Sequence, residues 1–162
     1  MANERKIRQF AREAGYEPLE GRCIIVRPAL GNLSEKIASF LKSLVECDRC
    51  VLQMCKNELI LLPFDPIWTS LRKNASLVLP YGEIRSVELG DDLLNTAITI
   101  HAGEDAIRLT AQQKALSDWR MSGLHATQFA GDYKNWHKEN IEATLKALMK
   151  LGGPERSALR FA

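Results

Sequence analysis

The sequence lacks a long apolar run. Its longest strongly apolar stretch is Leu59–Phe64, far shorter than the roughly 20 residues that a membrane-spanning helix needs. The first six residues include three charged ones, Glu4, Arg5 and Lys6, and lead into no apolar segment, so the pattern of a secretory signal is missing. These two absences predict a soluble protein of the cytoplasm.

Catalytic motifs are also missing. The sequence contains no GxSxG elbow, HExxH pair, phosphate-binding P-loop or Rossmann glycine pattern. The three histidines, His101, His125 and His137, are far apart, and His137 falls on the apolar stripe of a predicted helix. A hydrogen-bonded core histidine is favoured there over a catalytic base. We therefore expect no enzyme, no catalytic residue and no cofactor.

The charge shows little imbalance. Lys and Arg number 22 and Asp and Glu number 20, for a formal net charge of +2 over 162 residues. Without a basic stripe, the chain does not fit a nucleic-acid-binding protein. Its length suits one domain that buries a core without needing disulfides or a metal.

Four cysteines are present, and Cys47 and Cys50 form a CxxC pair. Such a pair supplies half of a zinc site or a redox couple, so both remain alternatives. A structural zinc site needs four ligands, and the sequence has no second pair at a suitable spacing. We expect free thiols packed in a core, and no metal.

Helical periodicity appears in three segments. Ile7, Phe10 and Ala11 mark a short helix over residues 4–14, and a second apolar stripe marks a helix over 33–46. A third helix is predicted over 133–151, with Asp132 as its cap. The region 111–132 has no clear period, and we expect it to be partly helical.

Between these helices the apolar period changes to two, which is typical of strands. A short strand, Cys23–Val26, is predicted before residue 46. Six more follow in close succession, which indicates an antiparallel meander and an α+β, mainly β fold: Cys50–Cys55, Glu58–Phe64, Ser76–Leu79, Ile84–Leu89, Ala97–His101 and Ile107–Thr110. Gly90–Asp92 is expected to form a turn.

Two phrases in this region resemble bacterial pleckstrin-homology-like (PH-like) domains. Val51–Phe64 is similar to their first hairpin, and Leu79–Leu89 is similar to a strand of the type I-P-Y-x-x-I-x-S-V-x. Trp136–Ile141 resembles the start of their closing helix. The resemblance implies a bent seven-stranded antiparallel barrel capped by a C-terminal helix, and it implies no enzyme.

On this basis the chain divides into an N-terminal helical segment (1–46), a PH-like barrel with its helix (47–151) and a loose tail (152–162). The expected role is a binding module for a protein partner or for a second copy of itself, acting at an unclosed barrel edge. The acidic strands between residues 83 and 105 suit a basic partner.

Anionic lipid is the alternative ligand. Trp68, Arg72 and Lys73 share one loop and form a candidate lipid-binding cluster. Arg5, Arg8 and Arg12 give the first helix a basic face that suits a membrane surface. Docking of that helix on its own domain is the competing interpretation, and we favour it.

Overall fold

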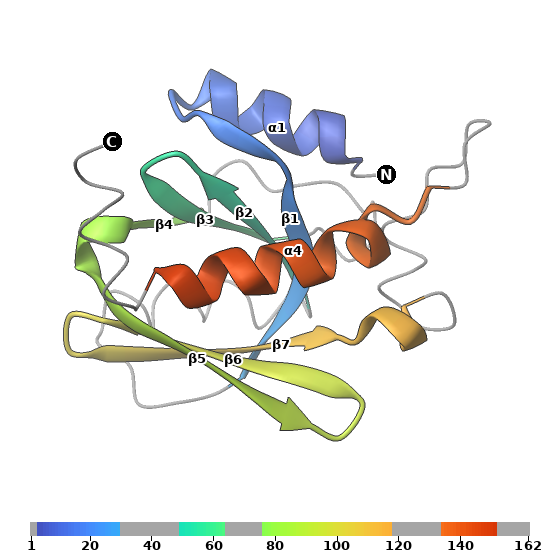
Figure 1. Ribbon diagram of the computed structural model, residues 1–162. Coiled ribbons are helices and arrows are strands. Elements are labelled where there is room, and N and C mark those ends of the chain that lie inside the picture. Colours follow the sequence, from blue (N-terminus) through green and yellow to red (C-terminus); the bar gives the residue numbers. More distant parts are fainter. Residues whose placement is uncertain (1–2, 30–48, 64–75, 118–133, 152–162) are drawn as a thin grey trace.

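The computed structural model describes residues 3–29, 49–63, 76–117 and 134–151 (Figure 1). It contains two α-helices, two short 3₁₀ turns and seven strands in this part of the chain. The helices are α1 (Glu4–Glu13) and α4 (Trp136–Lys150), and the 3₁₀ turns are η1 (Tyr81–Glu83) and η2 (Lys114–Leu116). The strands are β1 (Pro18–Ala29), β2 (Cys50–Cys55), β3 (Glu58–Pro63), β4 (Leu77–Pro80), β5 (Ile84–Asp92), β6 (Asn95–Ala102) and β7 (Asp105–Gln112).

The seven strands form one antiparallel sheet in the order β4-β3-β2-β1-β7-β6-β5. The predicted α+β, mainly β class is therefore confirmed. The six strands predicted after residue 46 are all present, with ends shifted by a few residues. Among the described strands the sheet is open, because its order runs from β4 to β5 and these two do not pair with each other.

The first strand is longer and more central than the sequence predicts. Cys23–Val26 pairs with β2, and Arg27–Ala29 then pairs with β7. The expected division at residue 46 thus separates β1 from both of its neighbours in the sheet. Pro18, Gly21 and Pro28 favour turns locally, but long-range pairing overrides that tendency.

Two apolar clusters lie on opposite faces of the sheet. The larger one gathers side chains from all seven strands and from α4, among them Leu52, Ile100 and Ile141. The smaller one joins α1 to β1, β2 and β3, with Ile7, Ile25 and Leu62 as members. The apolar residues of β2 alternate between the clusters, and with the buried side chain of Gln53 the whole strand is buried. Figure 1 shows α4 crossing in front of the sheet and α1 lying at the top.

Helix α1 docks on its own domain, as we favour from the sequence. The Asn3 side chain accepts a hydrogen bond from the Lys6 backbone N–H at 2.8 Å and caps the helix. Ile7 and Ala11 are fully buried against the sheet, and burial of an isoleucine side chain contributes about 1.5–3 kcal/mol. The Glu4 carboxylate also accepts from the Gly21 N–H at 3.0 Å.

Helix α4 is capped at a different residue from the one predicted. Asn135, rather than Asp132, accepts from the Lys138 N–H at 3.1 Å. Of the region 111–132, the first two residues belong to β7 and η2 follows, which agrees with partial helix there. The predicted helix over 33–46, the remainder of 111–132 and the tail 152–162 lie outside the described residues.

A buried amide supports an irregular start of β1. The register of β1 against β2 shifts between Pro18 and Cys23. The Gln53 side chain, fully buried on β2, donates to the Leu19 carbonyl at 3.0 Å and to the Met54 carbonyl at 2.7 Å. Gln53 thus donates to backbone carbonyls on β1 and β2 beside the point where their register shifts.

Replacement of this amide by a carboxylate should strongly destabilise the fold. Gln53→Glu keeps the shape, but it places a buried negative charge against two carbonyl oxygens. We expect a loss of about 3 kcal/mol or more in the free energy of unfolding at neutral pH. Urea denaturation measures this loss. Asn57→Asp, the same chemical change at an exposed residue of the β2–β3 turn, is the control and should change stability by under about 0.5 kcal/mol. Equal effects of the two substitutions would contradict the role of Gln53.

Candidate functional site

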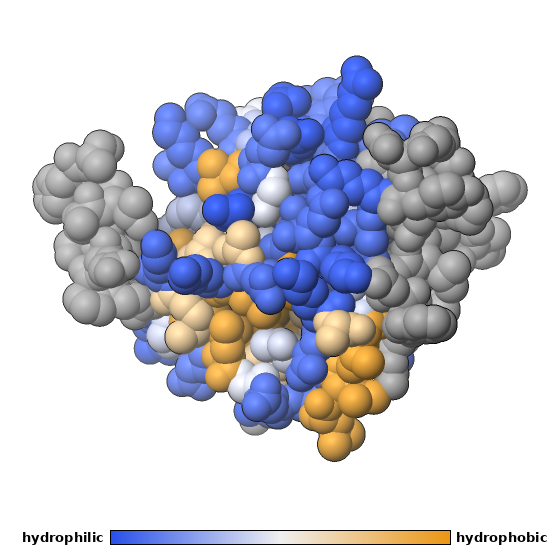
Figure 2. Space-filling model, turned by 45° about the vertical axis from the view of Figure 1, so that its right-hand side comes forward, coloured by the Kyte–Doolittle hydropathy of each residue, from blue (hydrophilic) through white to orange (hydrophobic). Residues whose placement is uncertain are grey.

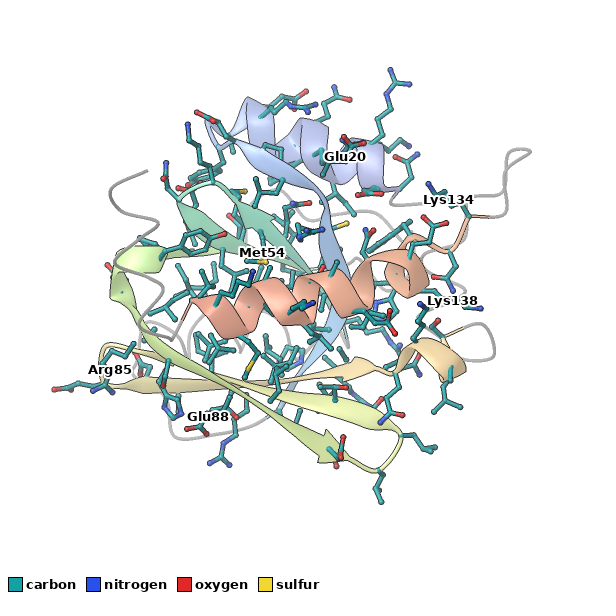
Figure 3. The ribbon with its side chains drawn as sticks, in the orientation of Figure 1. Glu20, Met54, Arg85, Glu88, Lys134 and Lys138 are labelled. Carbon is teal, nitrogen blue, oxygen red and sulfur yellow. The ribbon has the colours of Figure 1, made fainter. Side chains whose placement is uncertain are left out.

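The three arginines of α1 do not form one free cluster. Arg8 makes an ion pair with Glu20 at 3.2 Å, and its side chain is only 19% exposed. Glu20 lies beside α1 in Figure 3. Arg5 and Arg12 are exposed on the helix. With Ile7 and Ala11 facing the sheet, the basic face of α1 has no apolar side left to insert into lipid.

The other predicted ligand residues lie outside the described part of the chain: Trp68, Arg72, Lys73 and Cys47. Among the residues that are described, no helix is long and apolar enough to cross a bilayer. The same part of the chain contains no group of three or more potential metal-ligating side chains.

The described cysteines, Cys23, Cys50 and Cys55, are thiols rather than disulfides, and all three are buried. Burial raises the pKa of the Cys23 thiol well above its usual value, and the charge of Glu4 adds to this effect. Burial, with a contribution from Glu58, raises the pKa of Cys55 to about 12. Both thiols therefore stay protonated at neutral pH, and the thiolate is the reactive form.

These thiols should resist alkylation in the native protein. After brief treatment with iodoacetamide at neutral pH, peptide mass spectrometry should find Cys23 and Cys55 unmodified. Both should react fully once the protein is unfolded in guanidinium chloride, which serves as the control. Rapid modification of either thiol in the folded protein would contradict this prediction, because it would show that the core around that thiol opens readily.

The most constrained polar group is the buried side chain of His137 on α4. The backbone N–H of Ile25 on β1 donates to its Nδ1 at 3.0 Å. Because Nδ1 accepts, the neutral ring carries its proton on Nε2, which lies 3.0 Å from the Gln112 carbonyl oxygen of β7 and donates to it. Both ring nitrogens are therefore occupied by backbone partners.

The ring lies where a hydrogen bond between two strands would otherwise be. In the register of the β1–β7 pairing, where Arg27 is opposite Thr110, Gln112 would lie opposite Ile25. The described pairing of β1 with β7 does not extend that far. His137 bridges Ile25 and Gln112, which satisfies both groups at the point where the strands separate. Asn140, one turn further along α4, donates to the Cys23 carbonyl at 3.1 Å.

This environment keeps His137 neutral. Burial lowers its pKa to about 4, and the positive charge of Arg49 acts in the same direction, while the hydrogen bond to Gln112 opposes both. A ring that is neutral at pH 7 with both nitrogens bound to backbone cannot act as a base. The prediction of a hydrogen-bonded core histidine is thus confirmed.

His137 should make stability depend on pH. The ring takes up a proton near pH 6.5 in the unfolded chain, but only near pH 4 in the folded protein. The contribution of His137 to the free energy of unfolding is therefore fully present above about pH 6.5. It is lost as the pH falls to about 4, and the loss is about 3 kcal/mol in total. Urea denaturation at a series of pH values measures this slope.

Two variants separate the charge from the hydrogen bonds. His137→Gln places an amide oxygen against the Ile25 N–H and an amide N–H against the Gln112 carbonyl, so it should fold but lose much of the slope. His137→Leu leaves both backbone groups unpaired and should cost about 2–4 kcal/mol at neutral pH. His101→Gln, the same substitution at a partly exposed histidine, is the control. A slope that survives in His137→Gln would assign it to other groups.

One of the two edges of the described sheet is β5. This nine-residue strand pairs with β6 on one side, and no described strand pairs with its other side. Glu88 lies 3.5 Å from the His101 ring on β6. Figure 3 shows Arg85 and Glu88 pointing away from α4.

The turn that follows β5 differs from the prediction. The strand continues through Gly90 and Asp91 to Asp92, and the turn is formed by Leu93 and Leu94. Two leucines carry no turn signal, so sequence reasoning missed them. Leu93 is 92% exposed and Leu94 43% exposed, and the end of this hairpin forms an apolar patch at the lower edge of Figure 2.

Comparisons with known proteins assign no family. No family model matches the chain, and no curated protein does. Among solved structures, the C-terminal domain of an unknown protein from Leishmania infantum is similar with a TM-score of 0.43 and 15% sequence identity. That match covers 72% of this chain and 96% of the other.

Proposed function

We propose that this chain is a non-catalytic binding module of PH-like fold that engages a protein partner or a second copy of itself through the open edge of β5. The seven antiparallel strands and the helix α4 packed on one face of the sheet support the PH-like assignment. The buried thiols of the described cysteines support a cytoplasmic location.

The observation that carries the proposal is the contrast between the two outer strands. β4 has four residues and ends in Pro80, which has no backbone N–H. β5 has nine residues and no proline. Short strands and prolines are two of the features that protect the edges of natural sheets, and β5 has neither; its register shift is confined to its first residues, between Ile84 and Ser86. An extended segment of a partner can therefore add to β5 by main-chain hydrogen bonds.

The charge around this edge indicates the kind of segment that would bind. Glu83, Glu88, Asp91 and Asp92 are exposed on or beside β5, with Arg85 as the one basic residue between them. A partner strand with Lys or Arg would gain from this field, and an anionic surface would be repelled.

Association with anionic lipid through α1 remains a second candidate, because Arg5, Lys6 and Arg12 are exposed. Burial of Ile7 and Ala11 leaves this candidate with electrostatic attraction alone. Such attraction contributes about 1 kcal/mol per basic residue near an anionic membrane. It therefore ranks below the β5 edge.

Proline substitutions in β5 test the proposal. The N–H groups of successive residues in an antiparallel strand point to opposite sides, so only one of Gly90→Pro and Asp91→Pro removes a donor from the open edge. That variant should keep its pairing with β6 and melt near the wild-type temperature, while the other should be less stable.

Binding is then measured for the stable variant. Native mass spectrometry over a range of concentrations gives self-association, and a tagged chain gives capture of other proteins. The edge variant should bind at least about tenfold more weakly, a loss of about 1.4 kcal/mol. Ser76→Pro, outside β5, is the control and should bind as wild type. Unchanged binding by the edge variant, or a chain that stays monomeric and captures nothing, would overturn the proposal.

A further inference from the structure

The turn between β5 and β6 has an unusual backbone. Leu93 has a φ of +54°, a left-handed conformation that glycine and asparagine adopt readily and branched side chains rarely do. Its side chain gains no packing in return, because it is 92% exposed. A strained residue that also exposes apolar surface is typical of a site held for contact with another molecule.

The charge near this turn restricts what that molecule can be. Asp91 and Asp92 precede the leucines and are exposed. From Ser86 to Ile107 the sequence has five acidic residues and no Lys or Arg. The end of the hairpin therefore exposes two apolar side chains beside acidic ones. An anionic membrane would repel it, whereas a protein surface with basic side chains would suit it.

The chain itself carries a surface of the opposite sign. Arg5, Lys6 and Arg12 are exposed on α1 beside one exposed acidic residue, Glu13, and the three cations make no ion pair with a described residue. Leu19, at the start of β1, is 40% exposed and is followed by Glu20, which pairs with Arg8. Figure 1 shows α1 at the top of the molecule and the β5–β6 turn at the bottom.

We infer that the Leu93–Leu94 turn of one copy contacts the basic face of α1 in a second copy. Opposite charges at opposite ends of the molecule match this arrangement. Because the two surfaces differ, the contact is head to tail, and such contacts extend into chains or rings unless geometry closes them. The turn adjoins β5, but α1 lies apart from that edge (Figure 1), so variants of α1 test this inference without altering the β5 edge.

Two variants, each blocked at one surface, test the contact. The turn-blocked protein carries Asp91→Asn and Leu93→Asn. The helix-blocked protein carries Arg5→Glu and Arg12→Glu, and it keeps Arg8 because that side chain pairs with Glu20. Each alone should remain monomeric in native mass spectrometry and sedimentation velocity. A mixture should form a 1:1 complex and nothing larger, since one intact surface of each kind remains.

Glu104→Gln is the matched control. It makes the same kind of charge change in the β6–β7 turn, another exposed turn of the sheet, and should associate as wild type. Circular dichroism checks that each variant is folded. Wild-type association should also weaken as salt rises, because exposed charges are screened.

The single substitution Leu93→Asn separates strain from contact. Asparagine relaxes the left-handed turn, so the melting temperature should rise by about 2–4 °C, while association should weaken at least about tenfold.

The inference fails if turn-blocked protein associates as wild type, or if the two blocked proteins do not combine. It also fails if the wild type is monomeric and its α1 instead binds phosphatidylserine vesicles in a way that the helix-blocked protein loses. The proline variants of β5 are read separately, so either idea can fail alone.

Discussion

The fold depends on a change of pairing partner along β1. Its first part pairs with β2 and its last residues pair with β7, so it belongs to both halves of the sheet. Strands that separate leave backbone groups unpaired inside the protein, and these are costly. The neutral ring of His137 accepts from Ile25 and donates to Gln112, which removes that cost and fixes α4 at the same point. The packing of α4 over the larger apolar cluster follows from this attachment.

Local pattern predicts much of this structure, because alternating burial leaves a direct trace in the sequence. The segment Cys50–Cys55 is predicted as a strand with the observed ends, and the apolar stripe of α1 marks the residues that are buried. No local sequence pattern marks β1 as the central strand, because its partners lie some 25 and 80 residues further along the chain. The Leu93–Leu94 turn is missed for a different reason: its backbone contradicts the preference of leucine.

The candidate site was predicted less well than the fold. The sequence shows three arginines at helical spacing, but the pairing of Arg8 with Glu20 depends on how β1 returns past α1. His137 was predicted as a core histidine from its place on an apolar stripe. Its two backbone partners could not be predicted, because they lie 112 and 25 residues away in the sequence. Likewise, Gln53 interrupts an otherwise apolar strand, which signals a buried amide without indicating which carbonyls it reaches.

The position of His137 in the chain also has a consequence for synthesis on the ribosome. β1 emerges early, while β7 follows some 80 residues later and the bridging histidine about 110 residues later. Contacts between such distant segments form slowly. The central strand of the sheet therefore spends much of translation with one side unpaired and open to the wrong strand, a state prone to aggregation.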